Sequence, residues 1–461
     1  MTASEQLAQF AAGSKALPKL CREYKKERAT VHLKELVGGA LSFYAAAAVA
    51  KTGGVHIFVA EDRDAAAYLL NDFYNLLDEK QVYFFPSSYK RSAAYGAEDA
   101  QGVVQRTTAM NAVRGFTKGY LVVCTYPEAL AERVVDAATL QRDTIAVKLG
   151  DKISIAVLED ALADANFTRV DFVYEPGQYS VRGGIVDVFS YSESKPYRID
   201  FFGDEVDSIR RFNISSQLSA DKLDRVEIVP NLNAGEAPRV SFVQFAGSSA
   251  TCWFYDADYV LRRVNDLRRK VLADMEEPGQ IDRLLTSRNV LLRDMAGNSV
   301  VALRDNLPER PATAAVVFDT APQPKFNKNF EMLADDMIRN SLRGYATYIL
   351  SENKVQVERL ENIFHQIGRG QAAVRSLSVT LHEGFVDNDL KLCLYTDHQI
   401  FDRYQRYRIN GEIRRDEQMT VAELNQLRPG DYVVHIDHGV GRFDGLVKIN
   451  ENGKVHEAIK L

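Results

Sequence analysis

Apolar and polar residues follow two different periods along the first third of the chain. Short apolar runs separated by glycines and polar residues predict buried strands, which are Val31–Leu36, Val55–Ala60, Gln81–Phe85 and Tyr120–Thr125. Gly38-Gly39 precedes an alanine-rich helix that ends near Ala50. Asp62 and Asp64 are suited to cap a helix over Ala65–Leu77. Strand–helix–strand repeats of this spacing predict a parallel sheet with right-handed crossovers.

The pattern changes to short alternating runs between residues 150 and 230. The strands predicted there are Phe172–Tyr174, Ile185–Phe189, Tyr197–Phe202 and Glu205–Phe212. Gly203-Asp204 predicts the turn of a hairpin. This region therefore reads as an α+β insert, distinct from the parallel sheet.

A second α/β unit is predicted further along. After a helix over Tyr255–Met275, its elements are Phe330–Ser341, Ala346–Leu350, Lys354–Gln366 and Leu390–Thr396. A polar, arginine-rich linker follows at 401–420, and strands resume with Tyr432–Ile436. Because the residues from Arg428 onward are too few for an independent core, we expect the last domain to be incomplete.

Composition limits the functional classes. The net charge of −6 argues against a chain that binds nucleic acid through its overall charge. Four scattered cysteines without a C-x-x-C pair support neither a zinc ribbon nor a disulfide framework. No targeting segment and no membrane-spanning apolar run is recognised, so we expect a cytoplasmic protein without a membrane partner.

The turn Leu36–Tyr44 stands where a nucleotide-binding P-loop would stand. A P-loop needs glycines that expose backbone N–H groups, a lysine for phosphate charge and a hydroxyl for Mg²⁺. Gly38, Gly39 and Ser42 are present, but the lysine is missing. We therefore interpret this as a degenerate P-loop and expect no cofactor in this chain.

Other candidate chemistry is weak. His435 and His438 lack further ligands, so no metal site is predicted. The basic run Arg262–Lys270 is typical of a solvated helix face, with DNA or interdomain contact as the alternative. No nucleophile signature and no catalytic residue is assigned.

Three stretches carry a family resemblance. Val181-Arg-Gly-Gly-Ile-Val-Asp-Val-Phe, with Pro196-Tyr-Arg-Ile-Asp-Phe-Phe-Gly-Asp-Glu-Val-Asp-Ser-Ile-Arg-Arg-Phe, resembles the domain shared by UvrB and the bacterial transcription-repair coupling factors. Gly430-Asp-Tyr-Val-Val-His-Ile-Asp-His-Gly-Val-Gly-Arg-Phe-Asp-Gly-Leu resembles the start of their Tudor-like, CarD-like RNA polymerase interaction domain. Glu383-Gly-Phe-Val-Asp and Leu394-Tyr-Thr-Asp-His-Gln-Ile-Phe resemble the domain between them. Only the coupling factors combine all three in this order.

The resemblance implies partners and residues. The UvrB-like module would recruit UvrA, with Arg169 and Arg182 at the positions of the family's UvrA-binding arginines. Arginine suits this role because its planar guanidinium group can form a bidentate pair with a carboxylate. UvrB has a further arginine at the position of Ser180, which implies that the UvrA interface is partly different or weaker in this chain.

The polymerase interaction domain would bind the RNA polymerase β-subunit by adding a strand to it. Ile449 stands near the family's apolar contact, with a place in the core of a small barrel as the alternative. The family's translocase motor lies downstream, so ATP, Mg²⁺ and double-stranded DNA would belong to a longer protein.

Together these features predict a multidomain α/β and α+β chain, with a degenerate P-loop-type parallel sheet, an α+β insert, a second α/β domain and a truncated Tudor-like β domain. By resemblance, the boundaries are 1–115 for UvrB-like domain 1A, 116–212 for the UvrA-binding domain 2, 213–325 for domain 1B, 326–402 for domain 3, 403–422 for the linker and 423–461 for the start of the polymerase interaction domain.

Two other functions stay open. A UvrB-type excision-repair helicase would need a complete P-loop and a tyrosine-rich DNA-clamping hairpin, where this chain has Phe84-Phe-Pro-Ser-Ser-Tyr-Lys-Arg-Ser-Ala-Ala-Tyr. A CarD-like RNA polymerase-binding regulator would not need the long UvrB-like region.

Overall fold

A computed structural model gives the fold in two compact units, Met1–Glu412 and Ile413–Leu461. The residues that the structure describes are 2–89, 98–214, 216–233, 237–275, 278–405, 407–409, 430–435, 439–451 and 454–460. Because the two units are separate bodies, each is described by itself.

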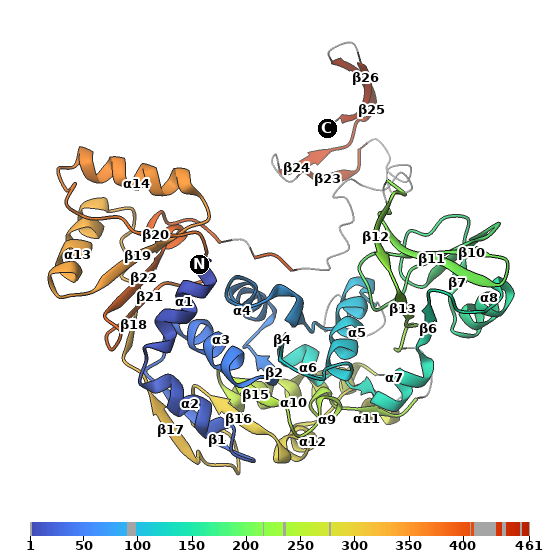
Figure 1. Cartoon of the computed structure of the whole chain (residues 1–461), viewed down its shortest axis with the longest axis horizontal. Coiled ribbons are helices and arrows are strands. Elements are labelled where there is room, and N and C mark those ends of the chain that lie inside the picture. Colours follow the sequence, from blue (N-terminus) through green and yellow to red (C-terminus); the bar gives the residue numbers. More distant parts are fainter. Residues whose placement is uncertain are drawn as a thin grey trace. The chain divides into compact units, whose positions relative to one another are not determined.

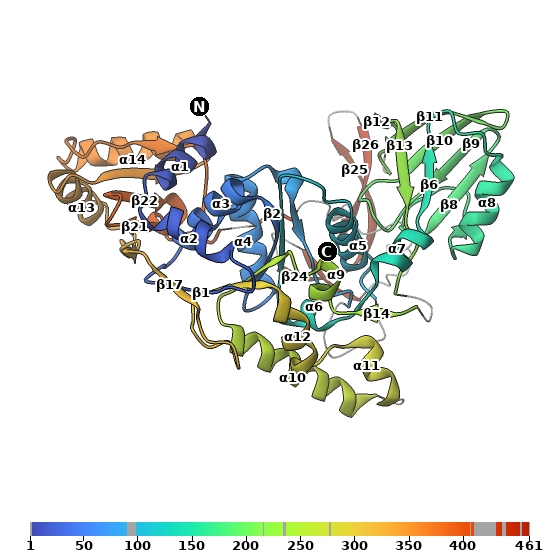
Figure 2. The same ribbon diagram turned by 60° about the horizontal axis from the view of Figure 1, so that its bottom comes forward.

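The centre of the first unit is a seven-stranded parallel sheet (Figures 1 and 2). Its strands, in order across the sheet, are β17 (Ala314–Val317), β1 (Thr30–Lys34), β16 (Ser299–Ala302), β15 (Thr251–Phe254), β2 (Gly54–Val59), β4 (Tyr120–Thr125) and β3 (Val82–Phe84). Most of these strands are short and rich in valine, as expected for strands that are covered on both faces. The predicted parallel sheet is confirmed.

Helices surround this sheet. The longer ones are α1 (Ala3–Ala12), α2 (Ala16–Tyr24), α3 (Ala40–Thr52), α4 (Arg63–Leu76), α5 (Ala100–Arg114) and α10 (Ala257–Asp274). The shorter ones are α6 (Pro127–Ala131), α7 (Ala137–Asp143), α9 (Phe242–Ala246), α11 (Ile281–Leu284) and α12 (Arg288–Asp294). The Asp62 side chain caps α4 as predicted by accepting from the backbone N–H of Ala65. Helix α1 was not predicted, although Thr2 and Glu5 form a capping box at its start.

The insert is a six-stranded sheet with one helix, α8 (Ile155–Asp164), against one face. Its strands, in order, are β12 (Ser219–Leu223), β11 (Glu205–Phe212), β10 (Tyr197–Phe202), β9 (Ile185–Val188), β8 (Gln178–Arg182) and β7 (Thr168–Arg169). Two strand pairs adjoin the sheets, namely β6 (Ile145–Lys148) with β13 (Arg225–Ile228) and β5 (Val134–Val135) with β14 (Arg239–Val240). The hairpin predicted at Gly203-Asp204 connects β10 and β11.

Two details differ from the sequence expectations. The strand predicted at Phe172–Tyr174 is wrong, because this segment is a loop held by the Gln178 side chain, whose Oε1 accepts from the N–H groups of Tyr174 and Glu175. β4 lies inside the predicted range 116–212 but pairs with β2 and β3 in the central sheet. A buried apolar strand carries no local sign of which sheet it will join.

A third sheet has five strands, β18 (Thr320–Pro322), β21 (Phe385–Asp387), β22 (Leu392–Thr396), β19 (Ala346–Leu350) and β20 (Ser376–Leu377). Helices α13 (Phe330–Leu342) and α14 (Lys354–Gln366) cover it, and α15 (Asp397–Ile400) follows β22. A separate hydrophobic cluster that includes Leu333, Ile349 and Leu360 forms its core. The second α/β unit predicted from the sequence therefore has its own core.

In the second unit, β23 (Tyr432–His435) pairs with β24 (Gly439–Arg442), and β25 (Gly445–Glu451) pairs with β26 (Lys454–Lys460). Ile436, His438 and most of the predicted linker 403–422 lie outside the described residues. At the coarse level, the predicted multidomain α/β organisation, with one parallel sheet and several other sheets, is confirmed.

Candidate functional site

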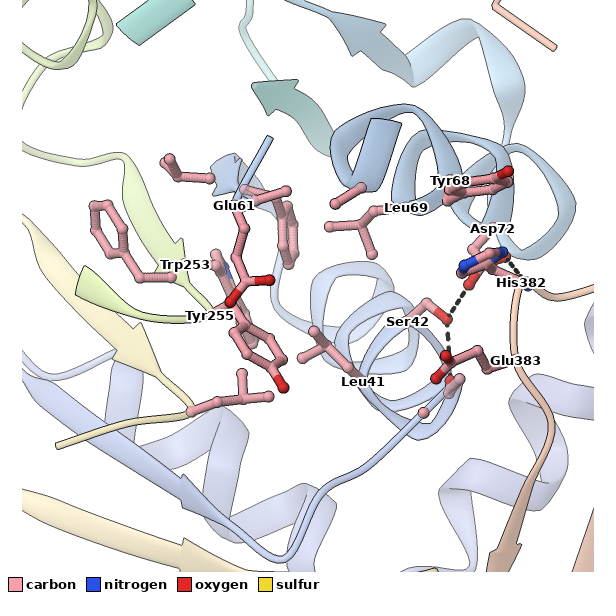
Figure 3. A pocket seen from close by; sticks show the side chains of 18 residues that line it. Leu41, Ser42, Glu61, Tyr68, Leu69, Asp72, Trp253, Tyr255, His382 and Glu383 are labelled. Atoms are coloured by element: carbon pink, nitrogen blue, oxygen red, sulfur yellow. Dashed lines mark hydrogen bonds between the residues drawn. The ribbon is translucent and has the colours of Figure 1, made fainter. Parts of the chain in front are cut away.

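The turn between β1 and α3 is the segment interpreted from the sequence as a degenerate P-loop (Figure 3). Gly38 has φ +56°, a left-handed conformation that glycine adopts without strain, and Gly39 directly precedes the helix. The geometry of a strand, a glycine turn and a helix is therefore present. In a functional P-loop, the space in front of this helix receives phosphate groups.

The segment before β21 lies against this turn. A Cβ atom on Gly39 would be 2.1 Å from the carbonyl oxygen of Glu383. A Cβ atom on Gly38 would be 3.3 Å from the Glu383 carboxylate oxygen Oε2. The glycines thus permit close backbone approach of the third sheet, and an anionic side chain stands beside the turn.

Ser42 has its hydroxyl engaged inside the protein. Its Oγ lies 2.7 Å from Asp72 Oδ2 and 3.0 Å from the carbonyl oxygen of Gly39. The other Asp72 oxygen accepts the backbone N–H of His382 at 2.7 Å. Burial raises the pKa of Asp72 to about 7, although these two hydrogen bonds oppose the shift. The P-loop hydroxyl therefore connects to the third sheet.

Further contacts fasten the third sheet to α3 and α4. Tyr44 on α3 donates to Asp387 Oδ2 at 2.5 Å, and both side chains are buried. The Tyr68 and His382 rings stack with centroids 3.7 Å apart. Burial raises the pKa of the Asp387 carboxyl. Since buried polar groups bonded in this way are costly to separate, the covered turn is a fixed part of the fold.

Arg182 lies on the face of the insert sheet away from α8. Its Nη2 is 2.6 Å from Asp187 Oδ2, and its guanidinium is 4.7 Å from the centre of the Phe172 ring. Arg198 also binds Asp187 through two nitrogens, at 2.7 and 2.8 Å. Asp187 is only 1% exposed, whereas the Arg182 side chain is 38% exposed. The buried carboxylate thus holds two arginines in place.

Arg169 lies on the opposite face of the same sheet edge. It is in register with Tyr179, whose side chain belongs to the insert core, and its Nη1 is 2.5 Å from Glu159 of α8. Ser180, the departure from the UvrB pattern, is buried and donates to the carbonyl oxygen of Asp171. The two arginines predicted for UvrA therefore share the β7–β8 edge but not a face.

Ile449 lies on β25 in register with His456 of β26. The surroundings of its side chain lie outside the described part of the chain. His435 ends β23, while His438 is among the residues not described.

The basic run on α10 consists mostly of paired side chains. Ion pairs join Arg262 to Asp258, Arg263 to Glu128, Arg268 to Asp282 and Arg269 to Asp266. This pattern favours a solvated helix face over a phosphate-binding one. Within the described ranges, no cluster of three or more potential ligands could hold a metal ion. The described helices also include none that is long and apolar enough to span a membrane.

Comparison with known proteins gives two family matches. Residues 145–233 match the UvrB interaction domain, and residues 427–461 match the CarD-like/TRCF RID domain. The first match runs from β6 through β13, and thus includes the whole six-stranded sheet.

Similar whole proteins are transcription-repair-coupling factors. The chain is 23% identical to that of Bacillus subtilis over 91% of its own length and 42% of the relative's length. It is 23% identical to that of Escherichia coli over 93% and 43%, and 22% identical to one from Staphylococcus epidermidis over 85% and 40%. The chain thus spans about two fifths of the curated relatives it matches. The resemblance predicted from the sequence is confirmed: over most of its length this chain is similar to transcription-repair-coupling factors, with the UvrB interaction domain and the CarD-like domain in the expected order.

Proposed function

We propose that this chain is the recruitment part of a protein that couples transcription to nucleotide excision repair. The observation that carries the proposal is the presence of a UvrB interaction domain and a CarD-like/TRCF RID domain in one chain. A UvrB-type helicase is less favoured because of the second domain and the covered P-loop turn. A CarD-like regulator is less favoured because the similarity to coupling factors covers most of the chain.

The insert, residues 145–233, is the proposed binding site for UvrA. Arg182 and Arg169 are the proposed contacts, and Asp187 and Phe172 present the Arg182 side chain at the sheet edge. Since the two arginines lie on different faces, UvrA would have to contact both faces of the sheet at the β7–β8 edge rather than one face alone. Arg169 would first have to exchange its ion pair with Glu159 for one with the partner.

Capture of UvrA by the immobilised chain tests this site. We expect Arg182→Gln and Arg169→Gln each to weaken capture by about tenfold, because each removes a charged interface contact. Arg142→Glu is the control, since this exposed arginine of α7 lies outside the six-stranded sheet and forms an ion pair with its neighbour Asp143. Full capture of UvrA by the double glutamine variant would exclude these residues as the contact.

The CarD-like domain is the proposed contact with the β-subunit of RNA polymerase, and Ile449 its apolar centre. Ile449→Arg distinguishes a contact with the polymerase from a place in the core of a small barrel. If Ile449 is a contact, the variant loses polymerase binding and keeps its melting temperature. If it belongs to a core, the second unit also melts earlier.

The control is Val440→Arg, which adds the same charge at an exposed position of β24. ATP hydrolysis, Mg²⁺ binding and translocation on double-stranded DNA are proposed for the longer protein and not for these residues.

A further inference from the structure

A cavity of about 280 Å³ opens beside the covered P-loop turn, at the carboxyl ends of β2 and β15 (Figure 3). Its walls are apolar, formed by Leu41, Phe58, Leu69, Trp253, Phe254 and Leu303. Tyr255 also lines it and is 42% exposed. Ligands of open α/β sheets bind at this edge, and an apolar pocket with a few polar groups is the usual form of a small-molecule site.

Three of the polar side chains that line the cavity are carboxyl groups, beside the hydroxyls of Ser42, Tyr68 and Tyr255 and the imidazole of His382. Glu61 lies beside Tyr255 at one end, and Asp72 and Glu383 lie at the other, with Leu41 and Leu69 between them (Figure 3). Among the described residues that line it, none is a lysine or arginine. The Arg304 guanidinium lies 5.9 Å from the centre of the Tyr255 ring and is paired with Asp256. The carboxylates of Glu61 and Glu383 therefore disfavour anions in this cavity, the opposite of what a nucleotide site requires.

The position in front of α3 is also occupied. The Glu383 carbonyl and carboxylate stand against Gly39 and Gly38. A phosphate group placed there would meet both steric overlap and like charge. The cavity has room for an aromatic ring but not for the charge that a nucleotide would bring.

We propose that this cavity binds a small aromatic molecule that carries a positive charge and no phosphate. The apolar walls would enclose the ring, and the carboxylates of Glu61 and Glu383 would attract the cation. This proposal is independent of the recruitment role, because the described residues that line the cavity belong neither to the insert nor to the second unit.

Matched probes test the charge preference on the full 461-residue chain. Tryptamine and indole-3-acetate share one ring system and differ in the sign of their charge. In calorimetric titrations we expect tryptamine to bind with a dissociation constant on the order of 1 mM, and indole-3-acetate and ATP not to saturate. Equal binding of the two indoles, or binding of ATP alone, would overturn the proposal.

Variants test the location. Glu61→Gln and Glu383→Gln should each weaken tryptamine binding by roughly threefold, because both carboxylates are partly screened by water. Glu205→Gln, which removes a carboxylate from the insert hairpin, should leave binding unchanged. Ala65→Trp places a ring at a half-buried lining position and should abolish binding without lowering the melting temperature. Undiminished tryptamine binding by the folded Ala65→Trp chain would show that the ligand binds elsewhere.

Discussion

Gly39 is the residue at which the degenerate P-loop meets the third sheet. Gly39→Ala should lower the free energy of unfolding by about 1–3 kcal/mol, because its Cβ would overlap the Glu383 carbonyl oxygen and force the segment away. Chemical denaturation measures the loss. Gly279→Ala is the control, since a Cβ there meets no atom of the described residues within 4 Å and should change little. Equal effects of the two variants would contradict the close approach.

Asp72, which accepts the backbone N–H of His382 beside this turn, makes the stability of the fold depend on pH. Because burial raises its pKa to about 7, the folded chain holds more protons on Asp72 than the unfolded chain between about pH 4 and pH 7. Its contribution to stability therefore falls as pH rises through that window and stays low above it. Asn keeps the acceptor for the His382 N–H and cannot ionise.

We expect Asp72→Asn to raise stability relative to the unmodified chain more at about pH 8 than at about pH 5, by on the order of 2 kcal/mol. Melting temperatures of both chains across this range provide the measurement. The exposed Asp160→Asn change on α8 should show no such trend. A stability difference that does not vary with pH would mean that Asp72 is ionised throughout.

Binding of Mg·ATP is a further test of the turn. Calorimetry should show no saturable binding, because the lysine is absent and the Ser42 hydroxyl contacts Asp72. A micromolar dissociation constant would refute both the sequence interpretation and the placement of Glu383.

Among the secondary-structure elements, β8, β9 and β10 depend on one buried carboxylate. Asp187→Asn should destabilise the insert by about 3 kcal/mol, because it leaves Arg182 and Arg198 without their shared ion pair. Asp207→Asn on β11 is exposed and should be neutral. The melting temperatures of the two variants provide the comparison. Equal melting temperatures would show that the ion pairs of Asp187 do not stabilise the insert.

Local patterns explain which elements could be predicted. Four elements have the predicted bounds, namely β10, β11, β19 and α14. In each, apolar residues recur at the expected spacing from end to end, and turn residues flank the element. The covered turn could not be predicted, because Gly39 and Glu383 are far apart in sequence and the contact leaves no local trace. The missing lysine predicted the loss of a nucleotide site, but not what takes its place. Likewise, the sequence selected Arg169 and Arg182 but could not place them on two faces, because β7 is only two residues long.

The whole molecule consists of two bodies with separate family matches. A chain ending at Glu412 should keep the melting temperature of the first unit and capture UvrA as well as the full chain does. Any capture of RNA polymerase shown by the 461-residue chain should be lost, because the matched CarD-like region is removed. Pull-downs with both partners, run beside a thermal melt, measure this. Loss of UvrA capture by the shorter chain would show that the two functions share a surface.

The sequence contains a single tryptophan, and it is Trp253. Its ring stacks on Phe58 with centroids 4.9 Å apart, its Nε1 donates to His56, and it lines the cavity beside the P-loop turn. Intrinsic tryptophan emission from the whole chain therefore arises from one point at the centre of the first unit. A shift of its emission maximum, or a change in its quenching by iodide, would report events at this cavity without any label.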